Sequence, residues 1–168
     1  MFGLPSVRLG KPFGIPLEID ASWLLVFFLV AASLTMSYLP AALPEGSSVL
    51  YVALGVLTAL AFFGSLVLPE LAPSLVARAG GLKVSRVTLF ALGGVSQMED
   101  EPRSPGHEFL LAAAGPATSV LLGLLLIGVT VALIALDVAD VVWVPLEYLG
   151  VINLSLAAFN LLPGFPLD

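Results

Sequence analysis

Four long apolar runs constrain the fold of this chain most strongly. They cover residues 21–39, 49–68, 109–136 and 143–162. Each approaches or exceeds the roughly 20 residues that a helix needs to cross the hydrocarbon core of a bilayer. Hydrophobic residues make up 59% of the 168 residues and charged residues only 11%, whereas a soluble domain has about 25% charged residues. The predicted fold class is therefore an all-α polytopic membrane protein, with a single membrane-embedded domain over residues 1–168.

The positions of the basic residues predict how these spans are oriented. Cytoplasmic loops of membrane proteins are enriched in Lys and Arg. All six basic residues lie before the first span or between the second and the third: Arg8, Lys11, Arg78, Lys83, Arg86 and Arg103. We therefore expect an integral membrane protein with both termini on the cytoplasmic side. The same topology places Glu70 and Asp168 at one membrane depth.

Residues 82–98 are predicted to form a short β-ribbon on the cytoplasmic side, between the second and third spans. Side chains alternate from Val84 onward, and the Gly93-Gly94 pair supplies a turn. This is the only segment for which we expect non-helical secondary structure. The exposed edge of such a ribbon can pair with an extended peptide. A surface ribbon without a partner is the alternative.

Glu70 is the most informative single residue. It lies where the second apolar run ends and the predicted helix continues to residue 78, with Pro69 before it and Pro73 after it. An acid at the centre of a membrane helix costs about 3 kcal/mol, so Glu70 should face the protein interior or a wet cavity. Each proline removes a helical hydrogen bond, so we expect the helix to kink or unwind there. In a purely structural interpretation, the prolines end the span and Glu70 is a solvated acid.

The sequence resembles the site-2 protease family, the intramembrane zinc metalloproteases of the peptidase M50 type. Four blocks carry the resemblance: PELAPSLVAR at residues 69–78, LFALGGV at 89–95, AGPA at 114–117 and FNLLPGFPLD at 159–168. The last block matches the family's N-x-x-P-x-x-x-x-D pattern at every specified position. If Pro69 and Pro73 were histidines, the first block would contain H-E-x-x-H, a motif that binds zinc on a helix.

The resemblance implies a role for each of these positions. In the family, two histidines and an aspartate bind zinc, and the glutamate between the histidines activates the zinc-bound water. Glu70 matches the general base and Asp168 matches the third ligand, while Pro69 and Pro73 stand at the positions of the missing histidines. A catalytic zinc usually has three protein ligands. We therefore expect zinc in the family but no tight zinc binding by this chain.

Four further residues are expected near the substrate. The resemblance places Asn160, Pro163, Gly93 and Gly94 at the substrate groove. Asn160 is expected either to bond a substrate backbone or to make an ordinary bond between helices.

Other polar and small residues have simpler interpretations. His107 is the only histidine; we considered it as a replacement ligand and favour an exposed loop residue. The acidic run at residues 99–101 is expected to be a solvated loop. Gly115, Ser119 and Gly123 recur every four residues, a spacing that lets membrane helices approach closely.

The leading functional hypothesis is a member of a protease family that cuts transmembrane peptides, inactive as written. The alternative is a non-catalytic membrane binding or scaffold protein, a pseudoprotease; a transporter is a weaker third hypothesis. Expected partners are a transmembrane peptide or membrane-protein substrate and the lipid bilayer, with no nucleic acid. The family pattern continues with glycine after the aspartate, so we expect a chain truncated after Asp168. The two prolines are compatible with a natural pseudoprotease, an engineered inactivation or two altered positions.

Overall fold

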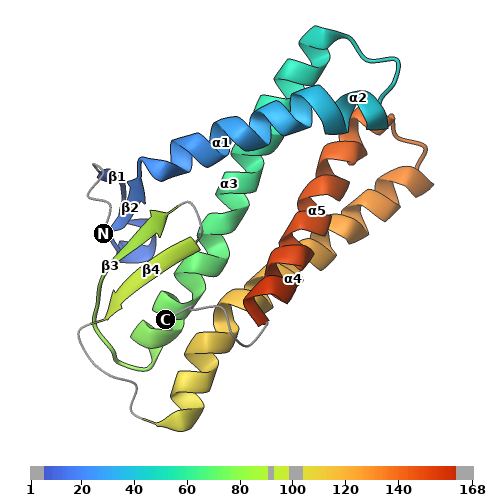
Figure 1. Cartoon of the computed structure of the whole chain (residues 1–168). Coiled ribbons are helices and arrows are strands. Elements are labelled where there is room, and N and C mark those ends of the chain that lie inside the picture. Colours follow the sequence, from blue (N-terminus) through green and yellow to red (C-terminus); the bar gives the residue numbers. More distant parts are fainter. Residues whose placement is uncertain (1–5, 91–92, 99–103, 162–168) are drawn as a thin grey trace. The chain divides into compact units, whose positions relative to one another are not determined.

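The computed structural model describes residues 6–90, 93–98 and 104–161. Within these residues, four helical segments are long and apolar enough to cross a membrane: Ser22–Ala42, Ser48–Ala79, Pro105–Ala135 and Asp140–Leu161. They are shown in Figure 1. The chain is thus mostly helical with four candidate membrane spans, as expected, but the four strands described below make it not all-α, and the side of the membrane on which they lie stays a prediction.

The first of these segments contains three consecutive elements. Helix α1 covers Ser22–Ser33, a π-helical turn covers Leu34–Tyr38, and α2 covers Leu39–Ala42. Pro40, the second residue of α2, has no N–H to donate, yet the helical segment that the π-helical turn and α2 form continues through it without a break. The helical segment therefore continues past the expected end at residue 39. The other three segments are α3 (Ser48–Ala79), α4 (Pro105–Ala135) and α5 (Asp140–Leu161).

A four-stranded sheet accompanies the helices. Its strands are β1 (Ser6–Gly10), β2 (Leu17–Asp20), β3 (Val84–Phe90) and β4 (Gly93–Met98), in that spatial order. Strands β1 and β2 are antiparallel, β2 and β3 are parallel, and β3 and β4 are antiparallel. The expectation of non-helical structure at 82–98 alone was wrong, because residues before the first span add two strands to the sheet.

The chain is divided into two compact units. One contains residues 1–26 and 67–118, and the other contains residues 27–66 and 119–168. The first unit holds the sheet, the beginnings of α1 and α4, and the end of α3. Most of α1, α3 and α4 and all of α5 belong to the second.

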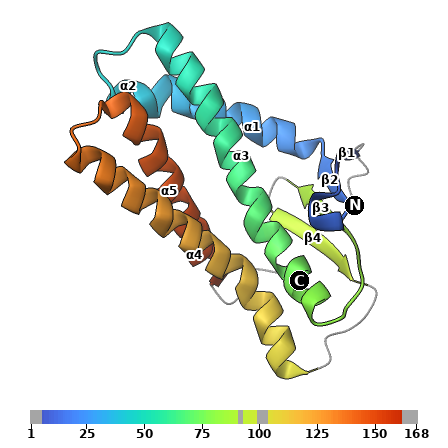
Figure 2. The same cartoon turned by 180° about the vertical axis from the view of Figure 1, so that it is seen from behind.

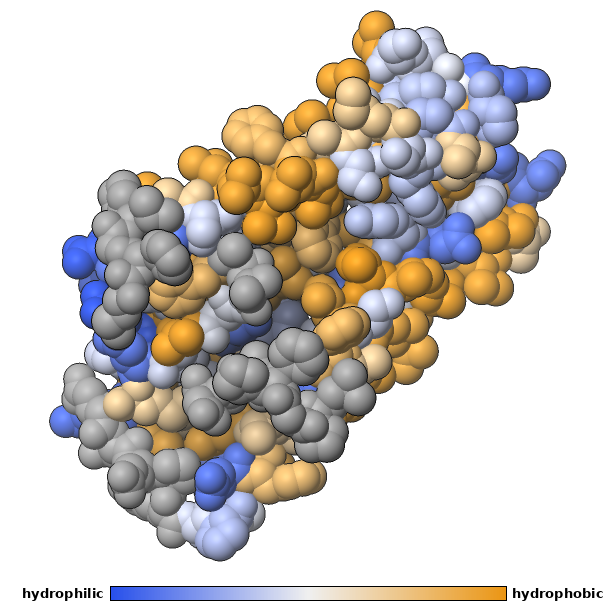
Figure 3. Space-filling model, viewed as in Figure 1, coloured by the Kyte–Doolittle hydropathy of each residue, from blue (hydrophilic) through white to orange (hydrophobic). Residues whose placement is uncertain are grey.

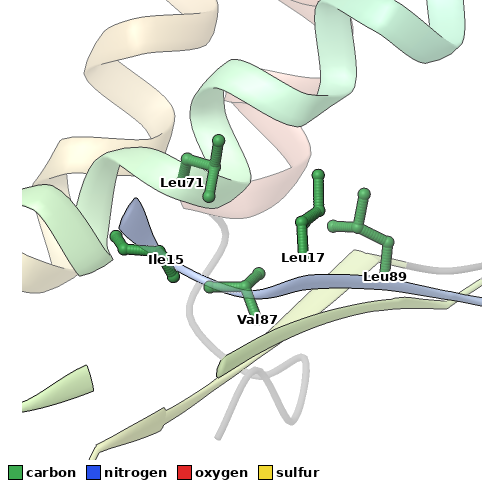
Figure 4. Close-up of a cluster of buried hydrophobic side chains, with 5 residues drawn as sticks. All are labelled: Ile15, Leu17, Leu71, Val87 and Leu89. Carbon is green, nitrogen blue, oxygen red and sulfur yellow. The ribbon is translucent and has the colours of Figure 1, made fainter. Parts of the chain in front are cut away.

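The core of the first unit joins the sheet to α3. Its buried side chains are Ile15, Leu17, Leu71, Val87 and Leu89, which Figure 4 shows between the helix and strands β2 and β3. Leu17 and Val87 are register partners across the parallel pair. Because Leu71 directly follows Glu70, this core fixes the helical turn that carries the acid. Figure 2 shows the same sheet beside the end of α3 from behind.

The second unit is a helical assembly with an apolar exterior. Its buried core comprises Ala31, Leu34, Leu39, Ala59 and Val144. Large apolar side chains such as Phe28, Leu57 and Leu121 are more than half exposed, and Figure 3 shows hydrophobic residues over much of the helical surface. A surface of this kind is stable in contact with lipid rather than water.

Asp20 stabilises the start of α1 in a pH-dependent way. Its Oδ1 accepts a hydrogen bond from the Ser22 N–H at 2.9 Å. Hydrogen bonds from the Ser22 side chain and backbone lower the pKa of the Asp20 carboxyl. A carboxyl with a lowered pKa in the folded state contributes stability above its unfolded pKa of about 4 and loses it as the pH falls below that value.

We therefore expect the unfolding temperature in detergent to fall less between pH ~6 and ~3 in Asp20→Ala than in the parent. The control is Glu45→Ala, which removes an exposed acid from the loop after α2. An identical pH dependence in Asp20→Ala and the parent would contradict the role of Asp20.

Candidate functional site

The candidate site lies on the last third of α3. This helix continues through Pro69 and Pro73 to Ala79. The helix therefore neither ends nor unwinds at the prolines, and the point at which the membrane span ends stays a prediction. Pro73 provides no N–H for the Pro69 carbonyl, but membrane helices tolerate such a loss where neighbouring protein packs against the break. Here α4 is that neighbour, since a methyl group on Gly115 would lie 3.2 Å from the Pro69 oxygen.

Glu70 is half-buried and faces the sheet. Its carboxylate accepts a hydrogen bond from the backbone N–H of Gly94. A methyl group on Gly94 would lie 2.5 Å from Glu70 Oε2, and one on Gly93 would lie 3.6 Å from Oε1. The structure thus brings together three residues that the sequence singled out. The two glycines form a cradle that admits the carboxylate because neither has a side chain.

A second polar contact holds the same strand against α3. Ser74 is fully buried, and its hydroxyl lies 2.8 Å from the hydroxyl of Ser96 on β4. This pair was not predicted from the sequence. Ser74 follows Glu70 by four residues and Ser96 follows Gly94 by two, so helical and strand periodicity place each on the face of its predecessor. Those two spacings were the only sequence features that could have predicted the Ser74–Ser96 contact.

Pro69 and Pro73 lie on the side of α3 that contacts α4. Pro69 is buried and Pro73 half-buried, and both are near the position that a methyl group on Gly115 would take. This confirms the close helix approach expected at Gly115. A proline side chain has no atom that can coordinate a metal. Across the described ranges, no group of three His, Cys, Asp or Glu side chains is arranged to hold a metal ion. The described residues therefore do not by themselves make up a catalytic zinc site.

Several predicted residues are not part of this arrangement. Asp168, Pro163 and the acidic run at 99–101 lie outside the described residues. Asn160 is in the last turn of α5 with an exposed side chain. The common membrane depth of Glu70 and Asp168 stays a prediction.

His107 differs from its expected environment. It lies in the first turn of α4, half-buried, and its ring packs so closely on Gly80 that a side chain there would collide with it. Its Nε2 atom is buried and has no hydrogen-bond partner in the part of the chain that the structure describes. The interpretation as an exposed loop residue was wrong because α4 begins at Pro105, two residues earlier than His107.

Four candidate spans and a small sheet packed against the acid-bearing turn of the second define a helical membrane protein. Residues 57–140 match the model of Peptidase family M50. The chain belongs to this family, the site-2 proteases, as the sequence resemblance indicated.

Individual relatives support the assignment. The Synechocystis sp. protein sll0528 is 41% identical over 165 residues, which cover 97% of this chain and 42% of that protein. Zinc metalloprotease MJ0392 of Methanocaldococcus jannaschii is 34% identical over 164 residues, covering 97% and 43%. The chain thus spans less than half of these relatives.

A solved structure, the site-2 protease from Methanocaldococcus jannaschii, is similar with a TM-score of 0.63 and 30% identity. The similarity covers 98% of this chain and 68% of that one.

The close packing of Gly94 against the Glu70 carboxylate can be tested by substitution. In Gly94→Ala, the new methyl group would overlap the Glu70 carboxylate and crowd Leu89. The carboxylate is the end of a flexible side chain, so we expect a loss of stability of about 1 kcal/mol, at the low end for overpacking. Unfolding in detergent measures this loss. Gly106→Ala is the control, because nothing lies within 4 Å of its new methyl group. Equal stability of the two variants would contradict the cradle.

Proposed function

We propose that this chain is an intramembrane protease domain that binds transmembrane peptides without hydrolysing them. The observation that carries the proposal is the environment of Glu70. Glu70, which we assign to the general-base position, is held by the sheet, while the residues one position before it and three positions after it are prolines on a continuous helix. Residues at i and i+4 share one helix face, so histidines at 69 and 73 would form the expected ligand pair.

The loss of activity follows from the number of available ligands. A catalytic zinc is held by three protein ligands and activates a bound water. With Pro69 and Pro73, only the proposed ligand Asp168 is left of the family's three. We assign no metal-dependent step to this chain, and Glu70 alone is not sufficient to hydrolyse a peptide.

Peptide binding does not require the missing ligands. Strand β4 lies at one end of the strand order, and the exposed edge of a sheet can add an extended peptide as a further strand. We propose that Gly93 and Gly94 line the groove for this peptide, with Asn160 and Pro163 contributing from the end of the fourth span. The proposed substrate class is the transmembrane segment of another membrane protein.

The proposal is tested by measuring zinc content, peptide binding and peptide cleavage on this chain and on a Pro69→His, Pro73→His variant. This chain is expected to bind a transmembrane peptide in detergent without cutting it. The variant is expected to bind zinc and to cut the peptide. Failure of the parent chain to bind any transmembrane peptide would reject the proposed peptide-binding function.

The proposed orientation has its own test. The chain has no cysteine, so single cysteines introduced at Glu45 and Lys83 are the only thiols in each variant. Both positions are exposed. In intact cells, a membrane-impermeant maleimide is expected to label Glu45→Cys. It should label Lys83→Cys only after lysis, because basic loops stay in the cytoplasm. The reverse pattern would place the candidate site on the outer side.

A further inference from the structure

A basic cavity in the first unit plays no part in the proposed function. Its volume is about 290 Å³, close to the lower limit of ordinary ligand pockets. It is lined by Arg8, Gly10, Lys11, Pro16, Glu18, Ser85 and Arg86. These residues come from β1, β2, β3 and the connection between the first two strands.

Glu18 organises the cations of this cavity. Its side chain is only 8% exposed, and its Oε1 accepts a hydrogen bond from Arg8 Nε at 3.1 Å. Arg86 Nη1 lies 3.6 Å from Glu18 Oε2, while Arg86 Nε donates to Gln97 Oε1 at 2.8 Å. A guanidinium has five N–H donors. Both guanidiniums therefore pair with Glu18 at the protein surface, where the side chains of Arg8 and Arg86 are 83% and 46% exposed, and both still have donors for a ligand.

The charge of the cavity selects the ligand. Arg8, Lys11 and Arg86 are positive and Glu18 is negative, so the lining has a net charge of about +2 at neutral pH. The protein as a whole has a charge of −6, which makes this concentration of positive charge local. The planar guanidinium group of arginine can donate two parallel hydrogen bonds to the oxygens of a phosphate group. A phosphate is thus the ligand class that the cavity recognises best.

The surroundings of the cavity favour a lipid phosphate. Strand β2 ends at Asp20 and the first candidate span begins at Ser22, so the cavity lies close along the chain to the start of a membrane helix. Phe13, in the connection that contributes Lys11 and Pro16 to the lining, is 67% exposed. Val7 and Leu9 are also exposed but alternate with Arg8 along β1, so they lie on the other face of the sheet. Exposed apolar residues next to cations are typical of segments that lie in a membrane interface.

The backbone near Phe13 supports the same placement. Phe13 has a positive φ of 51°, a conformation that is costly for a bulky residue. Its carbonyl accepts a hydrogen bond from Arg78 Nη1 at the end of α3. The turn is therefore held in a strained form that leaves the aromatic ring exposed beside Lys11.

We propose that this cavity binds the phosphate of an anionic lipid headgroup through Arg8, Lys11 and Arg86, with Glu18 positioning the two guanidiniums. The site lies on the sheet face that contains Glu18 and does not depend on peptide binding or cleavage. In this proposal the residues before the first span, which form β1 and β2, bind a ligand as well as completing the sheet.

Binding is tested on the full chain in a non-ionic detergent, by the shift in unfolding temperature on titration. The probes are dioctanoyl phosphatidylglycerol, dioctanoyl phosphatidylcholine and inorganic phosphate, at constant ionic strength. Phosphatidylglycerol is expected to give a saturable rise, phosphatidylcholine none, and inorganic phosphate a much weaker one. Equally tight binding of inorganic phosphate would overturn the lipid assignment, and a lack of saturable binding by phosphatidylglycerol would overturn the site.

Lys11→Ala identifies the site within the molecule. Removing one cation from a headgroup site is expected to raise the Kd for phosphatidylglycerol about fivefold. Lys83→Ala is the matched control, because Lys83 is an exposed cation of the same unit that does not line the cavity. An equal loss in both variants would show binding to general positive charge and reject the cavity.

A further variant guards against misfolding. Replacing Arg8 alone would take one cation away from the buried Glu18 carboxylate. The double variant Arg8→Gln, Glu18→Gln removes the guanidinium and the carboxylate together. It keeps the net charge of the lining at about +2, so weaker binding of phosphatidylglycerol at an unfolding temperature near that of the parent would report the lost guanidinium donors rather than a change of charge. Parent-like affinity in this double variant would also reject the cavity.

Discussion

The variant Pro69→His, Pro73→His is expected to purify with about one zinc ion per chain, whereas the parent is expected to carry less than about a tenth of that. The two new imidazoles would lie one helical turn apart beside Glu70, on a helix that is already continuous through both positions. Asp168 is the proposed third ligand. Elemental analysis of protein purified in detergent without chelators measures the ratio directly.

The variant should also fold well. Proline costs about 3 kcal/mol in a helix interior relative to alanine, and histidine costs much less. Both substitutions restore backbone N–H donors to α3, so a failure to bind zinc would not be explained by loss of the helix. Far-ultraviolet circular dichroism on each sample gives the helix content as a check.

Controls separate metal binding from catalysis. In the double-histidine background, Glu70→Gln should keep zinc and lose cleavage of a transmembrane peptide, because the amide cannot accept a proton from water. Asp168→Ala in that background should lower zinc content. The assignment of positions 69 and 73 fails if the double variant binds no zinc, or if the parent already binds one zinc per chain.

The helices of this fold could be predicted from the sequence more fully than the sheet. Apolar runs of about 20 residues leave little choice in a bilayer, and all four correspond to helical segments in the structure. Their ends were less certain, since Pro40 and Pro73 are compatible with either a helix end or a tolerated break. Packing against α4 decides the second case, and a local pattern contains no information about that neighbour.

Strands β1 and β2 were missed for a physical reason. They are five and four residues long, too short for an alternation pattern to be distinct from the surrounding Pro and Gly residues. Their stability comes from pairing between β2 and β3, which are more than 60 residues apart in the chain. Such a pairing depends on tertiary context that periodicity cannot show.

Part of the candidate site followed from sequence motifs. Glu70 and the Gly93-Gly94 pair belong to separate blocks of the family resemblance, and the structure places them in contact. The Ser74–Ser96 pair has no chemistry of its own that would single it out in a sequence. Its importance depends on burial, which only the packing of β4 against α3 reveals.

Gly123→Leu is expected to destabilise the second unit by about 3 kcal/mol, at the upper end of the usual cost of overpacking. Helices α4 and α5 approach closely at this point. Even a methyl group on Gly123 would lie 2.7 Å from Leu154 Cγ and 3.0 Å from the Gly150 carbonyl oxygen. The contact is reciprocal, since a methyl group on Gly150 would lie 2.8 Å from Ile127 Cδ1. A leucine at 123 therefore has to push the two backbones apart.

The size of this effect follows from the nature of membrane packing. Without a hydrophobic force between helices in lipid, close contact between small residues supplies much of the association energy. The matched control is Gly128→Leu on the same helix, where nothing lies within 4 Å of the added Cβ. It changes the same residue types and should leave stability unchanged or slightly higher, because leucine favours helix over glycine. Titration with a denaturing detergent measures both midpoints, and equal midpoints would show that α4 and α5 do not pack at Gly123.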